Sequence, residues 1–488
     1  MYCCIKHRAT YMYAGAYMLN AFQGEACSLN STSPDRSNAT PEECSTTFGM
    51  GETSKVSVCC TGKMVYINVA VCLSVLLLMI GLSVGLSVNT FKGRDVLNSV
   101  PLIDGHNDLP ENLYEKLSNN LSGFHFEDDL SNDDAWGRTA CPVCHTDLHR
   151  LIAGKVGGQF WVAYTGCESQ YKDAVQRTLR QIDVIKRLID RYPTNLQLVT
   201  VAADIETTWR NGRIASMIGI EGGQSLESSL AVLRLYYELG VRYMTLTHTC
   251  NTPWADASSV NDGSVYNLTE FGKKIVLEMN RIGMMVDLAH VSHNVMRDVL
   301  AVTRAPIIFS HSSAFSICQN YRNVPDDVLH SVKENKGIVM VNFYSGFVNC
   351  NSSRNATLQD VVDHINYIRN LIGVDYVGIG ADYDGVNSLP VGLEDVSKYP
   401  DLFDRLYDSR EGEPTWTKED LEKLAGRNFI RVFQMVETVR DFLSSEMPRE
   451  DIITGNELYI AQKRAGLKPG ECQTADEWKD VDPVLKIE

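Results

Sequence analysis

The sequence predicts an α/β fold: a (β/α)₈ TIM-type barrel preceded by a single transmembrane helix. From residue 100 onward, short apolar runs alternate with stretches of helical period, as expected for parallel strands joined by helices. Ionisable side chains lie at the ends of these runs. One uncharged segment, 64–88, is longer than expected for a helix buried in a globular core. These three observations also define the predicted domains, a tail, an anchor and a barrel.

The first two regions are a tail over 1–63 and an anchor over 64–88. The tail is rich in Ser, Thr and Asn and shows little periodicity, so we expect it to be disordered. The segment 64–88 has no charged side chain, and at about 1.5 Å per residue it exceeds a hydrocarbon core of ~30 Å. A cleaved signal peptide would lie nearer the start of the chain, so we predict a single membrane anchor.

Cysteines and glycosylation sequons indicate which side of the membrane the remainder occupies. Widely spaced cysteines together with several sequons favour an oxidising, glycosylating compartment. After the anchor these residues are Cys141, Cys144, Cys167, Cys250, Cys318, Cys350 and Cys472, with sequons at Asn120, Asn267, Asn351 and Asn355. We therefore predict a plasma-membrane protein with an extracellular catalytic domain, although sequons at Asn30 and Asn38 argue for the opposite orientation.

The region 100–488 is predicted to form the barrel. Its apolar runs are 100–108, 157–166, 214–223, 242–250, 283–290, 306–313, 337–344 and 376–385. Predicted helices include 171–192, with Val175, Leu179, Ile182 and Leu188 on one face, then 228–240, 268–283 and 416–443, the last packing outside the barrel. Eight units favour a closed barrel over an open doubly wound sheet, which more often has five or six strands. The run 196–201 is a possible extra strand.

Side chains that end these runs should converge, because parallel strands of a barrel open on one face. They are His106, Asp108, Glu221, His248, His290, His311, Asp382 and Asp384. Burying so many ionisable groups together is costly without a compensating cation, so we predict a divalent metal. Imidazole and carboxylate ligands suit catalytic zinc, while manganese, cobalt or iron remain open. Glu221 could bridge two ions that share a nucleophilic hydroxide.

Net charge is −16, which argues against a nucleic-acid partner because such a partner requires a basic surface.

Numerous motifs resemble those of the zinc-dependent membrane dipeptidases, also called renal-type dipeptidases. They include DGHNDLP (104–110), GKVGGQFWVAY (154–164), GIEGG (219–223), THTCNTPWAD (247–256), DLAHVS (287–292), FSHSSA (309–314), RNVPDD (322–327), ADYDGV (381–386) and GLEDVSKYPDL (392–402). The resemblance covers the chain from about residue 100 to its last helices.

The resemblance implies a (β/α)₈ barrel that hydrolyses dipeptides with two zinc ions per chain. It assigns His106 and Asp108 to one zinc and His290 and His311 to the other, with Glu221 bridging. It further implies that His248 contacts the substrate and stabilises the oxyanion, that Arg322 binds the terminal carboxylate, and that Asp382 transfers the proton. Without the resemblance, a surface salt bridge to Asp326 or Asp327 would be the simpler reading of Arg322.

The family pattern also implies disulfides Cys167–Cys250 and Cys318–Cys350, and a homodimer linked through Cys472. Cys141 and Cys144 remain in CPVCH, a formal match to a c-type haem motif, for which a local disulfide is the preferred interpretation. One departure is Gln224, where many relatives have histidine after EGG; it could alter hydrogen bonding around Glu221.

Two alternatives remain. A related metal-dependent amidohydrolase would share the barrel and the ligand types, and a catalytically silent surface receptor or scaffold would share the fold. The receptor would be expected to have lost a ligand or proton-transfer residue, and all of these positions are intact here.

Overall fold

A computed structural model describes residues 91–260 and 265–468 of the chain. The predicted tail, the anchor at 64–88 and Cys472 lie outside these residues. No helix within the described ranges is both long and apolar enough to cross a bilayer.

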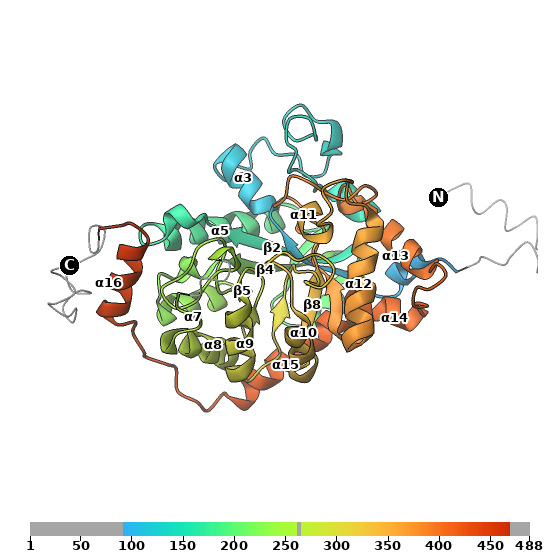
Figure 1. The fold of residues 1–488 in the computed structure, drawn as a ribbon. Helices are drawn as coiled ribbons and strands as arrows, with labels where there is room; N and C mark the ends of the chain where they lie inside the picture. Colours follow the sequence, from blue (N-terminus) through green and yellow to red (C-terminus); the bar gives the residue numbers. More distant parts are fainter. Residues whose placement is uncertain (1–90, 261–264, 469–488) are drawn as a thin grey trace, which may run out of the picture. The chain divides into compact units, whose positions relative to one another are not determined.

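Eight parallel strands form a closed ring, as the alternating pattern predicted (Figure 1). The ring runs β1-β2-β4-β5-β6-β7-β8-β9 and closes through the pairing of β9 with β1. The strands are β1 (Leu102–Asn107), β2 (Val156–Tyr164), β4 (Ile214–Glu221), β5 (Val241–Thr245), β6 (Met285–Asp287), β7 (Ile308–Phe309), β8 (Ile338–Val341) and β9 (Val377–Ile379). The possible extra strand also forms: β3 (Leu196–Leu198) pairs with the start of β4, below the point where β5 joins.

Helices surround the ring and connect successive strands (Figure 1). They are α3 (Leu109–Leu117), α4 (Leu148–Ala153), α5 (Ala174–Arg191), α6 (Ala203–Arg210), α7 (Leu230–Glu238), α8 (Glu270–Ile282), α9 (His293–Val302), α10 (Asp326–Asn335), α11 (Ser345–Val348), α12 (Leu358–Ile372), α13 (Tyr399–Tyr407), α14 (Lys418–Glu422), α15 (Asn428–Phe442) and α16 (Gly455–Arg464). Short 3₁₀ turns lie at Gly93–Asn98, Leu130–Asn132, Cys167–Ser169, Gly223–Leu226, Ser258–Val260, Val374–Tyr376 and Val396–Lys398, and a π-turn at Lys423–Arg427 links α14 to α15.

The buried face of α5 agrees with the predicted one at Ile182 and Leu188 but not at Leu179. Leu179 is 41% exposed, whereas Ile182, Ile185 and Leu188 are buried. The prediction for Leu179 was wrong because the helix is oriented by Ile182, Ile185 and Ile189, which recur at spacings of three and four and together present a larger apolar stripe.

The helix α15 covers the end of the barrel where the strands begin. Its Phe429 and Phe433 belong to the same apolar cluster as the barrel-interior side chains Phe160, Tyr243 and Met340. The amide of Asn428 donates to the carbonyls of Val374 and Val377 at the start of β9, at 2.7 and 2.9 Å. The predicted outer helix therefore closes the bottom of the barrel, and only the opposite end remains for a site.

Three disulfides pair the described cysteines within the chain. Cys167–Cys250 and Cys318–Cys350 match the pairing that the family pattern implied, and Cys141–Cys144 is the local disulfide. This pair uses both thiols of CPVCH and agrees with the local disulfide that the sequence favoured over haem attachment.

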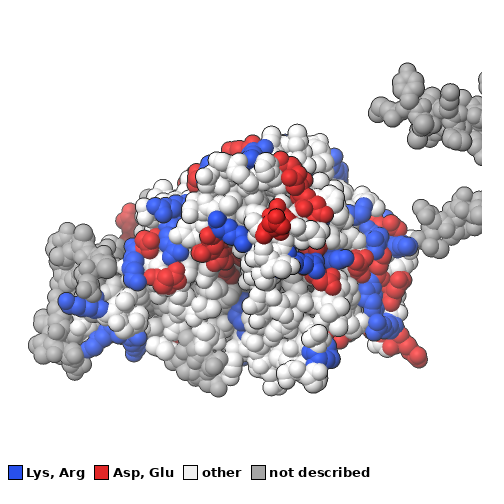
Figure 2. All heavy atoms as spheres, turned by 90° about the horizontal axis from the view of Figure 1, so that it is seen from above, with Lys and Arg blue, Asp and Glu red and all other residues white. Residues whose placement is uncertain are grey.

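Acidic and basic side chains are interspersed over the face seen from above in Figure 2. Such a mixture of signs is ordinary for a protein surface.

Candidate metal centre

The predicted metal ligands meet at the carboxyl ends of the strands. His106 is the penultimate residue of β1, and Asp108 directly follows the strand. Glu221 ends β4, and His290 and His311 follow β6 and β7. All five are at most 7% exposed, and Asp382, which follows β9, is buried with them. The barrel therefore brings together residues that are far apart in the sequence: His106 and Asp382 are separated by 276 positions.

The backbone at this face includes rare conformations. His290 and Asp382 have left-handed φ angles of 69° and 68°, which are uncommon for residues other than glycine. Such conformations persist where the surrounding structure imposes them, often at functional sites. Here they turn each side chain inward immediately after its strand.

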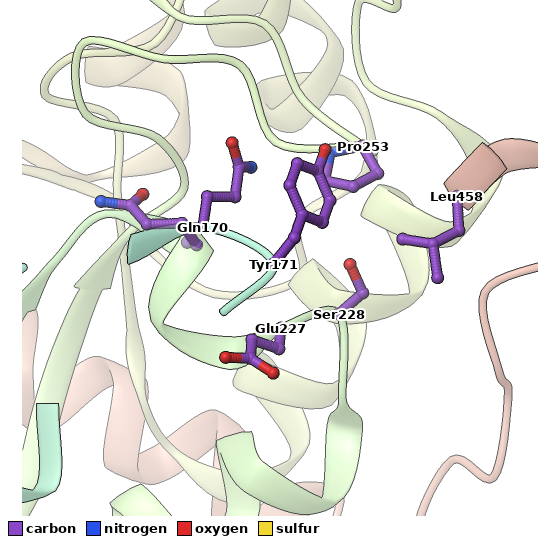
Figure 3. Close-up of a pocket in the computed structure, with 8 residues that line it drawn as sticks. Gln170, Tyr171, Glu227, Ser228, Pro253 and Leu458 are labelled. Atoms are coloured by element: carbon purple, nitrogen blue, oxygen red, sulfur yellow. The ribbon is translucent and has the colours of Figure 1, made fainter. Parts of the chain in front are cut away.

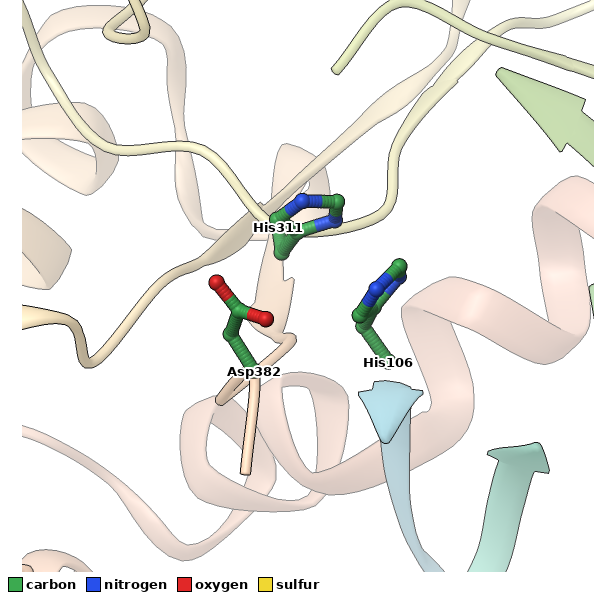
Figure 4. A group of neighbouring side chains, drawn as sticks. All are labelled: His106, His311 and Asp382. Atoms are coloured by element: carbon green, nitrogen blue, oxygen red, sulfur yellow. The ribbon is translucent and has the colours of Figure 1, made fainter. Parts of the chain in front are cut away.

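Three overlapping groups of side chains could each hold a cation. They are His106, Asp108 and Glu221; Glu221, His290 and His311; and His106, His311 and Asp382. Figure 4 shows the last group, with the two imidazoles and the carboxylate pointing toward one another. Glu221 Oε1 lies 2.8 Å from His290 Nε2, 3.4 Å from His311 Nε2 and 3.5 Å from His106 Nε2.

These separations fit a metal ion. Ligand atoms ~2.1 Å from a tetrahedral ion lie about 3.4 Å from one another, close to the spacings around Glu221. His106 Nε2 and Asp108 Oδ1 are buried without a hydrogen-bond partner among the described residues. A cation would satisfy both atoms, so the donor set fits the predicted metal.

Burial and neighbouring charges determine the protonation of the three imidazoles that would bind the metal. Burial lowers the pKa of His290 and of His311 far below the ordinary value, which keeps both rings neutral and able to donate a lone pair. Burial also acts to lower the pKa of His106, but the negative charges of Asp108 and Glu221 outweigh it and raise that pKa to about 10. The same carboxylates would attract a metal cation in place of this proton.

Tyr243 orients His106. The Tyr243 hydroxyl donates to the carbonyl of Gly105 at 3.0 Å, so at its 3.0 Å contact with His106 Nδ1 it acts as the acceptor. The proton of the neutral imidazole is then on Nδ1, and the lone pair on Nε2 faces the carboxylates. Gly219 makes room for this tyrosine, because a Cβ there would lie 2.3 Å from the Tyr243 ring.

Two buried carboxylates connect the loops that carry the ligands. Asp287 accepts from the backbone N–H groups of Ala289 and Ser310 at 3.0 and 2.9 Å, which ties the segment with His290 to the one with His311. Asp104 likewise accepts from the N–H of Ala381 at 2.8 Å and fixes the approach to Asp382. Burial raises the pKa of Asp287 and of Asp104.

His248 lies beside the proposed ligands. Its ring centroid is 4.3 Å from that of His290 and 4.7 Å from that of Tyr164. The Thr249 hydroxyl contacts His248 Nδ1 at 3.3 Å, which leaves Nε2 for another partner. Burial, only partly offset by Glu221, lowers the pKa of His248, so its imidazole is neutral.

Arg322 is buried beside His311 and has no acidic partner among the described residues. Its guanidinium contacts the His311 carbonyl at 3.3 Å and the Ser312 hydroxyl at 3.4 Å, and its Nε atom is unpartnered among the described residues. Asp327 instead pairs with Arg297 at 2.7 Å, so the simple surface salt bridge does not form. A buried, unpaired guanidinium is suited to bind a carboxylate.

Asp382 differs electrostatically from Glu221. Burial raises the pKa of Asp382 well above the ordinary value, and the neighbouring Asp108 and Glu221 raise it further despite the opposing charge of His106. Asn342 donates to Asp382 Oδ2 at 2.8 Å, which leaves Oδ1 for proton transfer.

Asp384 is the strand-end residue that does not join the ligands. Its carboxylate instead binds Thr146, the Asn112 amide and the N–H of His145, and it holds together the loops around the barrel mouth. The sequence analysis did not identify Tyr243, Asn342, Asp104 or Asp287 as site residues. Asp104 and Asp287 lie in the motifs DGHNDLP and DLAHVS, which also contain predicted ligands.

Gln224 is buried within the 3₁₀ turn that follows β4. Its amide donates to the Thr165 carbonyl at 2.9 Å. With Gln170, Tyr171, Pro253 and Leu458 it lines a hollow near α16 (Figure 3), which has room for about one water molecule. This hollow is too small for a substrate.

Comparison with known proteins identifies the family of this chain, and solved structures share its fold. The family model described as membrane dipeptidase (peptidase family M19) matches residues 91–446. The chain is 45% identical to dipeptidase 3 of Rattus norvegicus over 359 residues, 73% of this chain and 69% of the relative. The corresponding protein of Mus musculus is 44% identical, with 73% and 68% covered.

Solved structures support the fold alone, because their identities are low. A metallo peptidase from Rhodobacter sphaeroides, liganded with a phosphinate mimic of L-Ala-D-Ala, is 23% identical with a TM-score of 0.60, covering 69% of this chain and 99% of its own. A dipeptidase of the same family, M19, is 24% identical with a TM-score of 0.60, covering 69% and 98%. Because the family model matches residues 91–446 and the chain is 45% identical to rat dipeptidase 3, the chain belongs to the membrane dipeptidase family, peptidase family M19.

Proposed function

We propose that this metal-dependent dipeptidase uses two zinc ions, one held by His106 and Asp108 and the other by His290 and His311, with Glu221 between them. The observation that carries the proposal is the position of Glu221 Oε1, within 3.5 Å of imidazole nitrogens from three different strands. A carboxylate can serve two ions at once, whereas each imidazole nitrogen serves one. When bound, the zinc ions would polarise the scissile carbonyl and lower the pKa of water.

The protein side chains bind the dipeptide and move its protons. Arg322 holds the terminal carboxylate with two N–H groups, so a longer peptide would leave the guanidinium unpaired. His248 donates from Nε2 to the oxygen of the scissile carbonyl as negative charge develops there. Asp382 accepts the proton of the attacking water at Oδ1 and delivers it to the leaving amine.

Metal content and turnover test this proposal together. The purified full chain in detergent is expected to contain two zinc ions and to hydrolyse simple dipeptides, to lose activity to a chelator, and to regain it with zinc. Glu221→Gln should reduce the zinc content and lower kcat/KM by at least about 10³-fold, because it removes the charge shared by both ions. Glu206→Gln, an exposed change on α6, serves as the control. Two zinc ions and unchanged turnover in Glu221→Gln would refute the bridging role.

We further propose that the segment 64–88 anchors the protein in the plasma membrane with the barrel outside, and that Cys472 links a homodimer. Three disulfides in the described chain support an oxidising compartment. The sequon asparagines Asn120, Asn267, Asn351 and Asn355 are all exposed, which supports glycosylation. Glycosidase treatment and a non-reducing gel of Cys472→Ser test both points; an unglycosylated chain or an unchanged dimer band would contradict them.

A further inference from the structure

A cavity of ≈ 470 Å³ opens beside the proposed metal centre. It lies between α3, which contributes Glu111, Glu115 and Lys116, and the loop that follows β9, which contributes Asp384 and Gly385. Its volume falls within the range of about 300–1,000 Å³ typical of ligand pockets.

Gly385 joins this cavity to the reactive groups. A Cβ at this position would lie 2.1 Å from Asp108 Oδ2 and 2.7 Å from Asp382 Oδ1. The wall of the cavity is therefore in contact with a proposed metal ligand and with the proposed proton-transfer residue. The cavity therefore adjoins the metal centre across the backbone of Gly385.

Glu111 brings a carboxyl group without a hydrogen-bond or ion-pair partner among the described residues to this cavity. Its side chain is half-buried and makes no hydrogen bond or ion pair within the described residues. Lys116, the cationic side chain lining the cavity, donates instead to the Ala135 carbonyl at 3.2 Å and lies over the Trp136 ring.

The cavity and Arg322 adjoin different parts of the metal centre. Arg322 contacts His311, whereas the cavity wall contacts Asp108. If the carboxyl-terminal residue of a dipeptide is held by Arg322, as the proposed function requires, the amino-terminal residue lies toward the cavity.

We propose that this cavity is a specificity subsite for a cationic side chain, lysine or arginine, on the amino-terminal residue of the dipeptide, with Glu111 as its ion-pair partner. The inference rests on the proposed function. A desolvated ammonium or guanidinium here would favour the ionised form of Glu111 and form charge-assisted hydrogen bonds with it. A neutral chain of equal length would bury only its apolar part.

Glu111 also lies in the first turn of α3, where a carboxylate stabilises the helix dipole. That structural role would influence every substrate equally. Selectivity between a charged and an uncharged substrate therefore separates the two roles.

The experiment compares kcat/KM for Lys-Gly with kcat/KM for norleucine-Gly in the full-length enzyme. The wild type is expected to prefer Lys-Gly by about 10-fold or more, and Glu111→Gln should reduce this ratio to about 1. Glu206→Gln is the control: Glu206 pairs with Arg210 on α6 and does not line the cavity, so this change should alter the ratio by less than about twofold.

Two results would overturn the inference: an unchanged ratio in Glu111→Gln, or a preference for Gly-Lys over Gly-norleucine without one for Lys-Gly. If the wild type cleaves no dipeptide, the proposed function fails, and calorimetric binding of Lys-Gly and norleucine-Gly then tests the cavity by itself. A binding preference for Lys-Gly that disappears in Glu111→Gln would still support the subsite, and equal binding of the two would refute it.

Discussion

Removal of the Tyr243 hydroxyl is expected to weaken metal binding without removing any ligand. In Tyr243→Phe, the N–H at His106 Nδ1 loses its acceptor at 3.0 Å inside a fully buried site. An unsatisfied buried donor costs about 1–3 kcal/mol, and the imidazole can relieve that cost by shifting its proton to Nε2. That shift occupies the lone pair that the metal requires.

The expected magnitude follows from this competition. Loss of a hydrogen bond behind a metal-binding histidine typically weakens metal affinity by about 10–100-fold, which corresponds to about 1.4–2.8 kcal/mol. This range agrees with the cost of the orphaned donor. We therefore expect the zinc dissociation constant of the His106 position to rise by at least about 10-fold.

Competition with a chromogenic chelator measures this constant directly. Tyr236→Phe is the matched control, because its hydroxyl is also buried and donates to a backbone carbonyl, that of Ser225, at 2.8 Å. Both variants should lose comparable stability, but only Tyr243→Phe should lose zinc affinity. Equal zinc affinity in Tyr243→Phe and the wild type would show that Tyr243 does not select the His106 tautomer.

Three further perturbations test other parts of the site and the fold. Arg322→Met should lower kcat/KM for a dipeptide by about 100-fold while sparing a substrate amidated at its carboxyl end, because only the free carboxylate uses the guanidinium; equal losses for both substrates would refute the clamp. Asp382→Asn should lower kcat by about 10³-fold with zinc content retained, since it removes the proton acceptor but keeps the shape; near-normal kcat would exclude this role. Burial lowers the pKa of His364 to about 4, although its hydrogen bond to Val348 opposes the shift. Between about pH 6.5 and pH 4 the unfolded chain therefore binds more protons than the folded chain. Stability falls as the pH falls through that window. The free energy of unfolding in urea should fall by about 2 kcal/mol less between pH 7 and pH 5 in His364→Gln than in the wild type. The exposed variant His330→Gln should behave like the wild type. The same fall in His364→Gln and the wild type would show that His364 does not cause this pH dependence.

The strands and the convergence of the ligands could be predicted because both depend on local pattern. Each strand is a continuous apolar run that is buried on both faces, and parallel pairing then requires all carboxyl ends to face one way. His290 and His311 could be assigned to one site for this reason alone. Their motifs then matched a known family, which extended the prediction to Arg322.

The orienting residues could not be predicted, because their roles depend on contacts between distant segments. Tyr243 reads as an ordinary strand residue, and only the packed barrel brings its hydroxyl to His106. Asp384 shows the reverse case, since its position at a strand end suggested a ligand but the loop turns it toward Thr146. Which face of α5 is buried was likewise decided by packing and not by the position of Leu179.

The sequence by itself determined the eight-stranded barrel and the set of ionisable residues at its mouth, because hydrophobic period and strand polarity are properties of short segments. Only the tertiary structure decided which nitrogen of His106 faces the metal site, that Arg322 has no acidic partner in the described part of the chain, and that Glu111 borders an open cavity. Those features depend on distances between residues far apart in the chain, and such distances exist only once the barrel has closed.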